Sequence, residues 1–108
     1  MTKTERLYMN KSRAASLIAI ARAYTSGKMS YEEFDKRRSW AGVTQSAITA
    51  MATAHGAADL TNAHDLPCGL TCFAISYGRI GMNAGAFIDD AGRIYVVTGR
   101  TSALFALV

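Results

Sequence analysis

The sequence predicts a single α+β domain in which three N-terminal helices pack on a small antiparallel sheet of three or four strands. Three observations favour this fold class. The 108 residues suffice for one hydrophobic core. Apolar residues recur at three- and four-residue steps up to about residue 56, and β-forming residues alternate with turn signals from residue 68 onward. We therefore expect one domain over residues 1–108, with a helical half at 1–56 and a β-meander half at 68–108.

The first helix is expected over residues 4–26, which are rich in helix-forming residues with apolar side chains at helical spacing. Gly27 follows at the position where helices often end in a left-handed residue. These two signals together place the end of the helix near Ser26.

The start of the second helix carries several local signals. Ser30 can cap the helix, and Glu33 lies three residues later, as in a capping box. Met29 and Phe34 stand at the two positions of a hydrophobic staple. The pattern therefore predicts a helix over residues 31–41.

A third helix is predicted over residues 45–55, with Thr44 as its cap. Gly42 separates it from the second helix, and Gly56 ends it. Residues 57–67 are polar and lack any period, so we expect a loop there.

The C-terminal half shows the composition of a β-meander. Asp89, Asp90, Ala91 and Gly92 form a hairpin signal, with the glycine suited to a left-handed bulge position. Strands are expected at residues 70–77, 84–88 and 93–98, with a possible final strand at 102–108.

Charge is unevenly distributed along the chain. Twelve Lys and Arg residues outnumber eight Asp and Glu residues, and residues 1–40 hold nine of the cations against four acids. The hydrophobic content of 50% excludes a disordered chain. No apolar run is long enough to cross a bilayer, and two cysteines are too few for a disulfide framework. We therefore expect a cytoplasmic protein with reduced thiols and no membrane partner.

The most specific motif is the predicted helix, glycine turn and second helix around Gly42, the arrangement of a helix-turn-helix. The stretch Ala41-Gly42-Val43-Thr44-Gln45-Ser46-Ala47-Ile48, followed by Met51, resembles the turn and recognition helix of phage Cro-type repressors. The resemblance covers residues 41–51, a small part of the chain.

The resemblance implies a regulator that binds double-stranded DNA. Gln45, Ser46 and Thr49 would read bases, and the glutamine amide is suited to adenine in the major groove. Arg37 and Arg38, with Lys36 nearby, would contact phosphates. The predicted DNA-binding residues are Lys36, Arg37, Arg38, Thr44, Gln45, Ser46 and Thr49. The motif departs from the family at Arg38, where a small residue is usual.

Two alternatives remain open. The two helices can form a purely structural hairpin, since glycine-linked helices are common. The chain can also be a protein-binding inhibitor or modulator of a larger host complex, like the small anti-defence proteins that include the anti-CRISPRs. Its apolar C-terminal end, with Leu104, Phe105, Leu107 and Val108, suggests a homodimer formed through the sheet.

Catalytic and metal chemistry find little support in the sequence. Cys68 and Cys72 have a spacing that zinc pairs use, but further ligands would have to come from a loop. The candidates are His55, Asp59, His64, Asp65, Cys68 and Cys72. We expect no enzyme activity, no metal and no cofactor.

Overall fold

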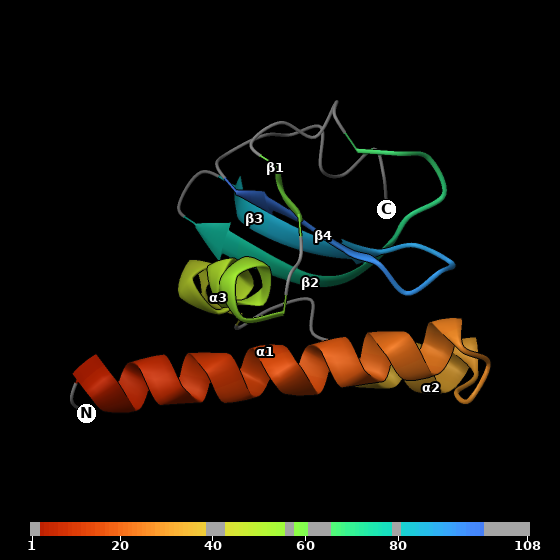
Figure 1. Cartoon of the computed structure of the whole chain (residues 1–108), viewed down its shortest axis with the longest axis horizontal. Helices are drawn as coiled ribbons and strands as arrows, with labels where there is room; N and C mark the ends of the chain where they lie inside the picture. The colour runs from red at the N-terminus through yellow and green to blue at the C-terminus, as the bar shows by residue number, and fades with distance from the viewer. Residues whose placement is uncertain (1–2, 39–42, 56–57, 61–65, 79–80, 99–108) are drawn as a thin grey trace.

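The computed structural model describes residues 3–38, 43–55, 58–60, 66–78 and 81–98, with side chains for residues 12–38, 43–52, 66–77 and 84–97. Helices come first and strands second along the chain, so the predicted α+β class is confirmed. The helices are α1 (Lys3–Thr25), α2 (Tyr31–Arg37) and α3 (Gln45–His55), and the strands are β1 (Ala58–Leu60), β2 (Thr71–Gly78), β3 (Gly81–Ile88) and β4 (Ile94–Thr98). Figure 1 shows α3 beside the sheet and the long α1 running beneath both.

The four described strands form one sheet in the order β1-β4-β3-β2. Strands β2, β3 and β4 are an antiparallel meander, as predicted. Strand β1 pairs parallel with β4, placing Ala58 opposite Tyr95. The prediction of a loop throughout residues 57–67 was wrong here, because three residues are too few to show a period. The predicted strand at 102–108 lies outside the described residues.

A β-bulge in β2 increases the apolar surface that faces the helices. Cys72 pairs with Phe87 and Ala74 pairs with Ala86, so Phe73 is an extra residue on the β2 side. Phe73 and Ala74 both join the core beneath the helices, whereas Cys72 joins the other face of the sheet. The bulge therefore breaks the strict alternation expected of a strand.

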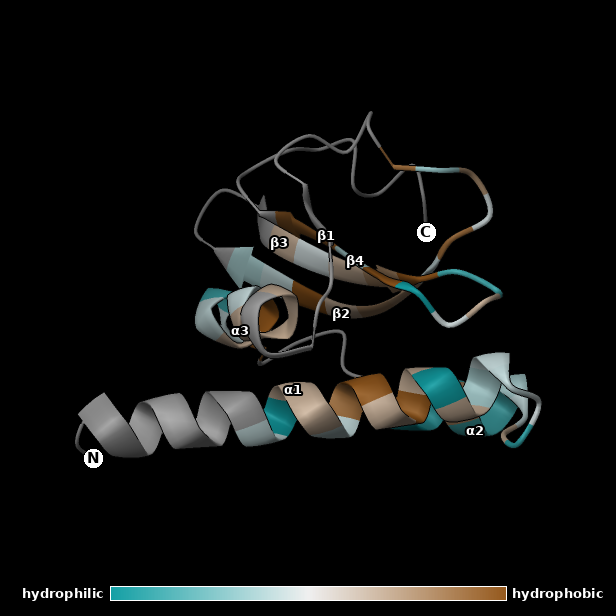
Figure 2. Ribbon diagram, viewed as in Figure 1, coloured by the Kyte–Doolittle hydropathy of each residue, from teal (hydrophilic) through white to brown (hydrophobic). Residues whose placement is uncertain are grey.

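Two hydrophobic clusters cover the two faces of the sheet. The larger one joins helices to strands, and its largest members are Leu17, Ile18, Phe34, Val43, Ile48, Met51, Phe73, Ile88, Ile94 and Val96. The smaller one packs residues of the loop before β2 on the opposite face and comprises Leu66, Leu70, Cys72, Ile75, Phe87 and Val97. Figure 2 shows hydrophobic residues in the C-terminal half of α1 and along the strands.

The end of α1 matches its prediction closely. The backbone N–H of Gly27 donates to Tyr24 at 3.1 Å and that of Lys28 donates to Ala23 at 2.9 Å, which is the Schellman pattern. Gly27 has a φ of 81°, a conformation that glycine adopts without strain.

Helix α2 begins as predicted but ends early. The Ser30 hydroxyl accepts the N–H of Glu33 at 3.2 Å, while the Glu33 carboxylate bonds Arg37. Arg38 has extended backbone, with φ −67° and ψ 153°, so the helix stops four residues before the predicted end at residue 41. Seven residues, 38–44, connect α2 to α3. Of these, residues 39–42, which include the predicted turn glycine Gly42, lie outside the described residues.

Candidate nucleic-acid interface

The first two turns of α3 divide cleanly into a buried and an exposed side. The Thr44 hydroxyl caps the helix by accepting the N–H of Ala47 at 3.1 Å. The apolar positions of the motif that the structure describes are buried, namely Val43, Ala47, Ile48 and Met51. The polar positions Thr44, Gln45, Ser46 and Thr49 are all exposed. We call these four residues the α3 polar face.

The α3 polar face is uncharged and rich in hydrogen-bonding groups. No acidic residue stands in the first turn of α3. The Thr49 hydroxyl donates to the Gln45 carbonyl at 2.9 Å, so its oxygen remains an acceptor. The Gln45 amide offers both donors and an acceptor. The first turn of any helix also carries N–H groups without helical partners and a partial positive charge.

The three basic residues at the end of α2 differ in what they contact. Lys36 is exposed and has no partner among the described residues. Arg37 is exposed and pairs with Glu33 at 2.7 Å. An exposed pair of this kind contributes little to stability, so the Arg37 guanidinium can exchange partners.

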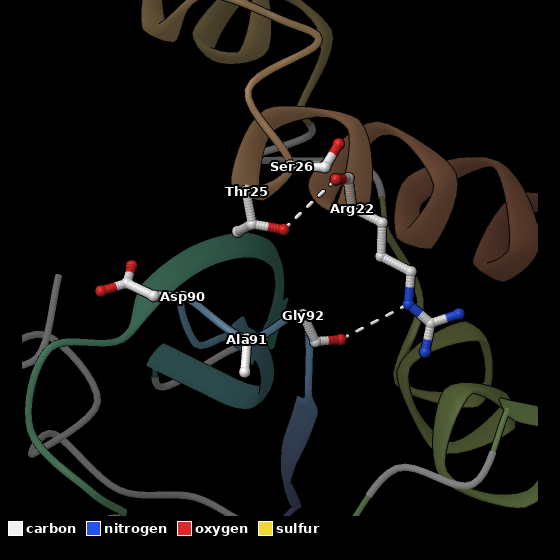
Figure 3. A pocket seen from close by; sticks show the side chains of 6 residues that line it. All are labelled: Arg22, Thr25, Ser26, Asp90, Ala91 and Gly92. Carbon is white, nitrogen blue, oxygen red and sulfur yellow. Dashed lines mark hydrogen bonds between the residues drawn. The ribbon is translucent and has the colours of Figure 1, made fainter.

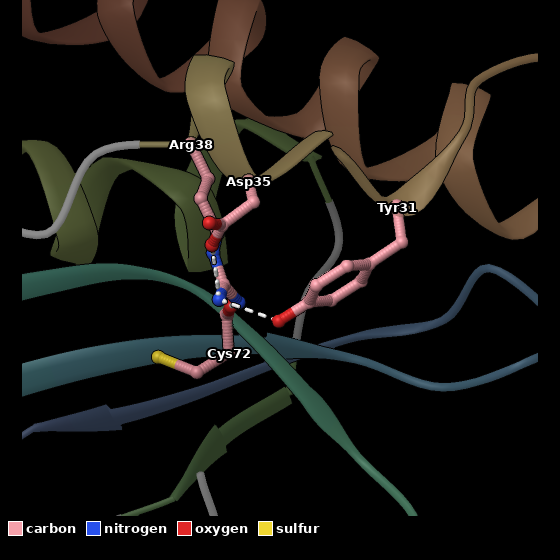
Figure 4. A network of polar contacts seen from close by, with 4 residues as sticks. All are labelled: Tyr31, Asp35, Arg38 and Cys72. Carbon is pink, nitrogen blue, oxygen red and sulfur yellow. Dashed lines mark hydrogen bonds and ion pairs between the residues drawn. The ribbon is translucent and has the colours of Figure 1, made fainter. Parts of the chain in front are cut away.

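The Arg38 side chain points inward and bonds other residues of the chain. Its side chain is only 8% exposed and forms an ion pair with Asp35 at 2.6 Å. Nη1 donates to the Cys72 carbonyl of β2 at 2.8 Å, and Nη2 donates to the Tyr31 hydroxyl at 3.3 Å (Figure 4). The guanidinium also lies 5.1 Å from the centre of the Phe34 ring. Arg38 therefore joins α2 to the edge of the sheet, and its guanidinium is not presented to a phosphate.

Helix α2 packs on α1, whereas α3 packs on both α1 and the sheet. The Phe34 ring of α2 stacks on Tyr24, near the C-terminal end of α1, with a centroid distance of 4.5 Å. Figure 1 shows α3 crossing nearer the N-terminal half of α1. Within the described residues, α1 and the sheet support α3, and the predicted turn at Gly42 lies outside those residues.

Sequence reasoning missed Tyr31 and Asp35 as partners of Arg38. The spacing of Asp35 and Arg38 was a readable signal, because residues three or four apart on a helix are neighbours. The contact with Cys72 joins residues 34 positions apart and had no local signal.

The candidate metal ligands do not form a described site. Among the residues that the structure describes, no group of three His, Cys, Asp or Glu side chains could hold a metal. The side chains of His55 and Asp59, and residues His64 and Asp65, lie outside that description. Cys68 is exposed and Cys72 is buried. Burial raises the pKa of the Cys72 thiol to about 12, because the thiolate would lose its hydration.

Within the described helices, none is long and apolar enough to cross a membrane. No protein-family model, curated protein or solved structure matches the chain significantly.

Proposed function

We propose that the chain is a small regulator that binds duplex DNA through the α3 polar face. The observation that supports this proposal is the joint exposure of Thr44, Gln45, Ser46 and Thr49 at the N-terminal end of a helix whose other side is buried. The exposed end of a helix can enter the major groove, where side-chain amides and hydroxyls read base edges.

Each group in this region has a distinct role in the proposed complex. The Gln45 amide pairs with a base edge, and adenine suits its donor and acceptor pattern. The helix N-terminus favours a phosphate through its N–H groups and its dipole. Lys36 and Arg37 add positive charge, Arg37 by exchanging its exposed partner Glu33 for a phosphate. Arg38 takes no part, because its guanidinium is bonded internally.

The proposal does not require a tight helix-turn-helix. Here α1 and the sheet hold α3 in place, so the resemblance to Cro-type repressors applies only to the buried and exposed positions of α3. A homodimer formed through residues 104–108 stays a prediction, because these residues lie outside the described part of the chain. Such a dimer would suit two half-sites about one DNA turn apart.

Opposite charges introduced at Gln45 test the proposal. Gln45→Glu places a carboxylate at a helix N-terminus, so it should keep or slightly raise the melting temperature while weakening duplex binding at least about tenfold. Gln45→Lys should keep or slightly lower the melting temperature and strengthen duplex binding. Binding is measured by fluorescence anisotropy on a pool of random-sequence duplexes over a range of salt concentrations.

Cys68→Glu is the matched control, because it adds the same charge at an exposed loop residue beside the other face of the sheet. It should leave duplex affinity nearly unchanged. The proposal fails if the protein shows no salt-dependent duplex binding, or if the two Glu substitutions weaken binding equally.

A second candidate is binding to a larger protein through α2. Tyr31 is 50% exposed, and its ring is held edge-on by Tyr24 at 6.0 Å. Exposed Glu32 and Lys36 give the same helix both signs of charge. A rigid tyrosine within mixed charge is typical of a protein interface and less so of a phosphate-binding surface.

This candidate predicts a different pattern among the variants. A partner retained on the immobilised protein after nuclease treatment should be lost with Tyr31→Ala and kept with Gln45→Glu. The reverse pattern, with duplex DNA as the retained species, supports the DNA proposal.

A further inference from the structure

The capping box predicted at the start of α2 is only half formed. The Ser30 hydroxyl accepts the backbone N–H of Glu33 at 3.2 Å, which is one of the two hydrogen bonds of this motif. The other bond joins the backbone N–H of the cap residue to the carboxylate three positions later, and Ser30 makes no such bond within the described chain. The Ser30 N–H is therefore a donor that the Glu33 carboxylate does not use.

The Glu33 carboxylate bonds Arg37 instead, one helical turn further along α2. Nε of Arg37 donates to Oε1 of Glu33 at 2.7 Å. The side chains of Arg37 and Glu33 are 56% and 43% exposed, so either can leave the pair without giving up buried contacts. Ser30 precedes Glu33 and Arg37 follows it along the helix, so the carboxylate must turn in opposite directions to reach them. Glu33 therefore has two alternative partners and bonds one at a time.

We propose that Glu33 is a switch that couples duplex binding to the cap of α2, an inference that rests on the proposed contact between Arg37 and a phosphate. In the free protein the carboxylate holds Arg37. When a phosphate takes the Arg37 guanidinium, the released carboxylate turns back and accepts the Ser30 N–H, which completes the capping box. The change costs little, because one exposed bond replaces another and a carboxylate is favoured in the first turn of a helix.

Glu33 is, on this proposal, an internal competitor of the phosphate. Duplex DNA must displace its carboxylate before Arg37 can bind, and the completed cap offsets part of that cost. The neighbouring Glu32 is exposed and makes no side-chain bond within the described chain. It carries the same charge without the same contact, which makes it a matched control.

The first arm of the test uses no DNA and follows hydrogen exchange of the Ser30 amide by NMR. Arg37→Met releases Glu33, so exchange at Ser30 should slow at least about threefold as the amide becomes bonded. Adding Glu33→Ala to Arg37→Met should abolish this slowing.

Two variants control for the lost positive charge. Lys36→Met removes the cation beside Arg37 and leaves the ion pair intact. Arg22→Met removes an exposed arginine from α1, where its Nε donates to the Gly92 carbonyl of the β3–β4 hairpin at 3.4 Å (Figure 3). Neither variant should change hydrogen exchange at Ser30.

The second arm adds a pool of random-sequence duplexes. Duplex DNA should slow exchange at Ser30 in the native protein and not in Glu33→Ala. Glu33→Gln keeps a side chain that can complete the cap but loses the ion pair. It should therefore raise duplex affinity about twofold more than Glu32→Gln, which removes the same charge from the adjacent residue.

The switch is overturned if Arg37→Met leaves exchange at Ser30 unchanged, if a charge control slows it equally, or if the two Gln variants raise duplex affinity equally. An absence of duplex binding contradicts the DNA proposal and with it the coupling. Failure of the switch alone is distinguishable, because duplex binding would then persist while exchange at Ser30 stays unchanged in Arg37→Met.

Discussion

The C-terminal end of α2 and the first turns of α3 were predicted to form one DNA-binding surface. In the structure the two regions differ in how accessible their side chains are. The α2 end is the more strongly charged, but Arg38 bonds the sheet and Arg37 pairs with Glu33. The α3 polar face has no charge, but its four side chains are exposed. The difference teaches that a charged residue contributes to binding only where the fold leaves its charge accessible.

Arg38 is drawn inward because a carbonyl group at the edge of the sheet needs a hydrogen-bond donor. Strand β2 is the outermost described strand on its side, and its Cys72 carbonyl accepts a hydrogen bond from Arg38. A partly buried carbonyl without a donor would cost about 1–3 kcal/mol. The α3 polar face meets no such requirement, because its residues are exposed and water can bond the unpaired N–H groups of the first turn.

The largest effect is expected from Phe34→Ala, which removes the apolar anchor of α2. The ring is fully buried and stacks on Tyr24, so its loss should lower the free energy of unfolding by about 3–5 kcal/mol. Chemical denaturation measures this value, and Tyr31→Phe, at the half-exposed position beside it, should cost less than about 1 kcal/mol. Similar costs for the two variants would show that α2 is not anchored through its buried face.

Arg38→Met and Arg37→Met should separate folding from binding. Arg38→Met removes the bonds to Cys72, Asp35 and Tyr31 and should cost about 2 kcal/mol of stability. Arg37→Met breaks an exposed pair and should cost less than about 0.5 kcal/mol.

For binding to duplex DNA, the proposal predicts the opposite ranking, with the larger effect from Arg37→Met and the smaller from Arg38→Met. Arg37→Met should lower the salt dependence of affinity by about one phosphate contact, while Arg38→Met should leave it unchanged. A lower salt slope in Arg38→Met, measured where that variant is fully folded, would contradict the structural role of Arg38.

A further effect on stability concerns the thiol of Cys72, the residue whose backbone carbonyl bonds Arg38. The folded pKa is about 12, whereas the usual value is 9.0, so the unfolded chain loses this proton first as the pH rises. Stability is therefore unaffected below about pH 9 and falls above it, by about 1 kcal/mol between pH 9 and pH 10. The difference in denaturation free energy between the native protein and Cys72→Ala measures this loss.

Thiol labelling at neutral pH provides a second readout on the same contact. Cys68 should react quickly and Cys72 slowly, since one is exposed and the other buried. Arg38→Met should speed the labelling of Cys72 if Arg38 holds the β2 edge closed. If Cys72 is labelled at the same rate in the native protein and in Arg38→Met, Arg38 does not hold the β2 edge closed.

Predictions succeeded where the determining contacts are short in sequence. The cap at Ser30, the end of α1 at Gly27 and the hairpin at Gly92 each depend on bonds between residues at most five positions apart. Predictions failed where the contacting residues are far apart in the sequence. Strand β1 exists because it pairs with β4, and α2 ends at Arg37 as Arg38 turns toward Cys72.

The sequence by itself therefore determined the class of the fold, the order of helices and meander, and which side of α3 is buried. Those features follow from local backbone preferences and from hydrophobic spacing. Only the tertiary structure decided that α3 is supported by α1 and the sheet, that Arg38 is withdrawn from the surface, and that Arg22 of α1 bonds the Gly92 carbonyl of the β3–β4 hairpin. These depend on which distant groups need a hydrogen-bond partner or an apolar neighbour, and that is settled only when the chain has packed.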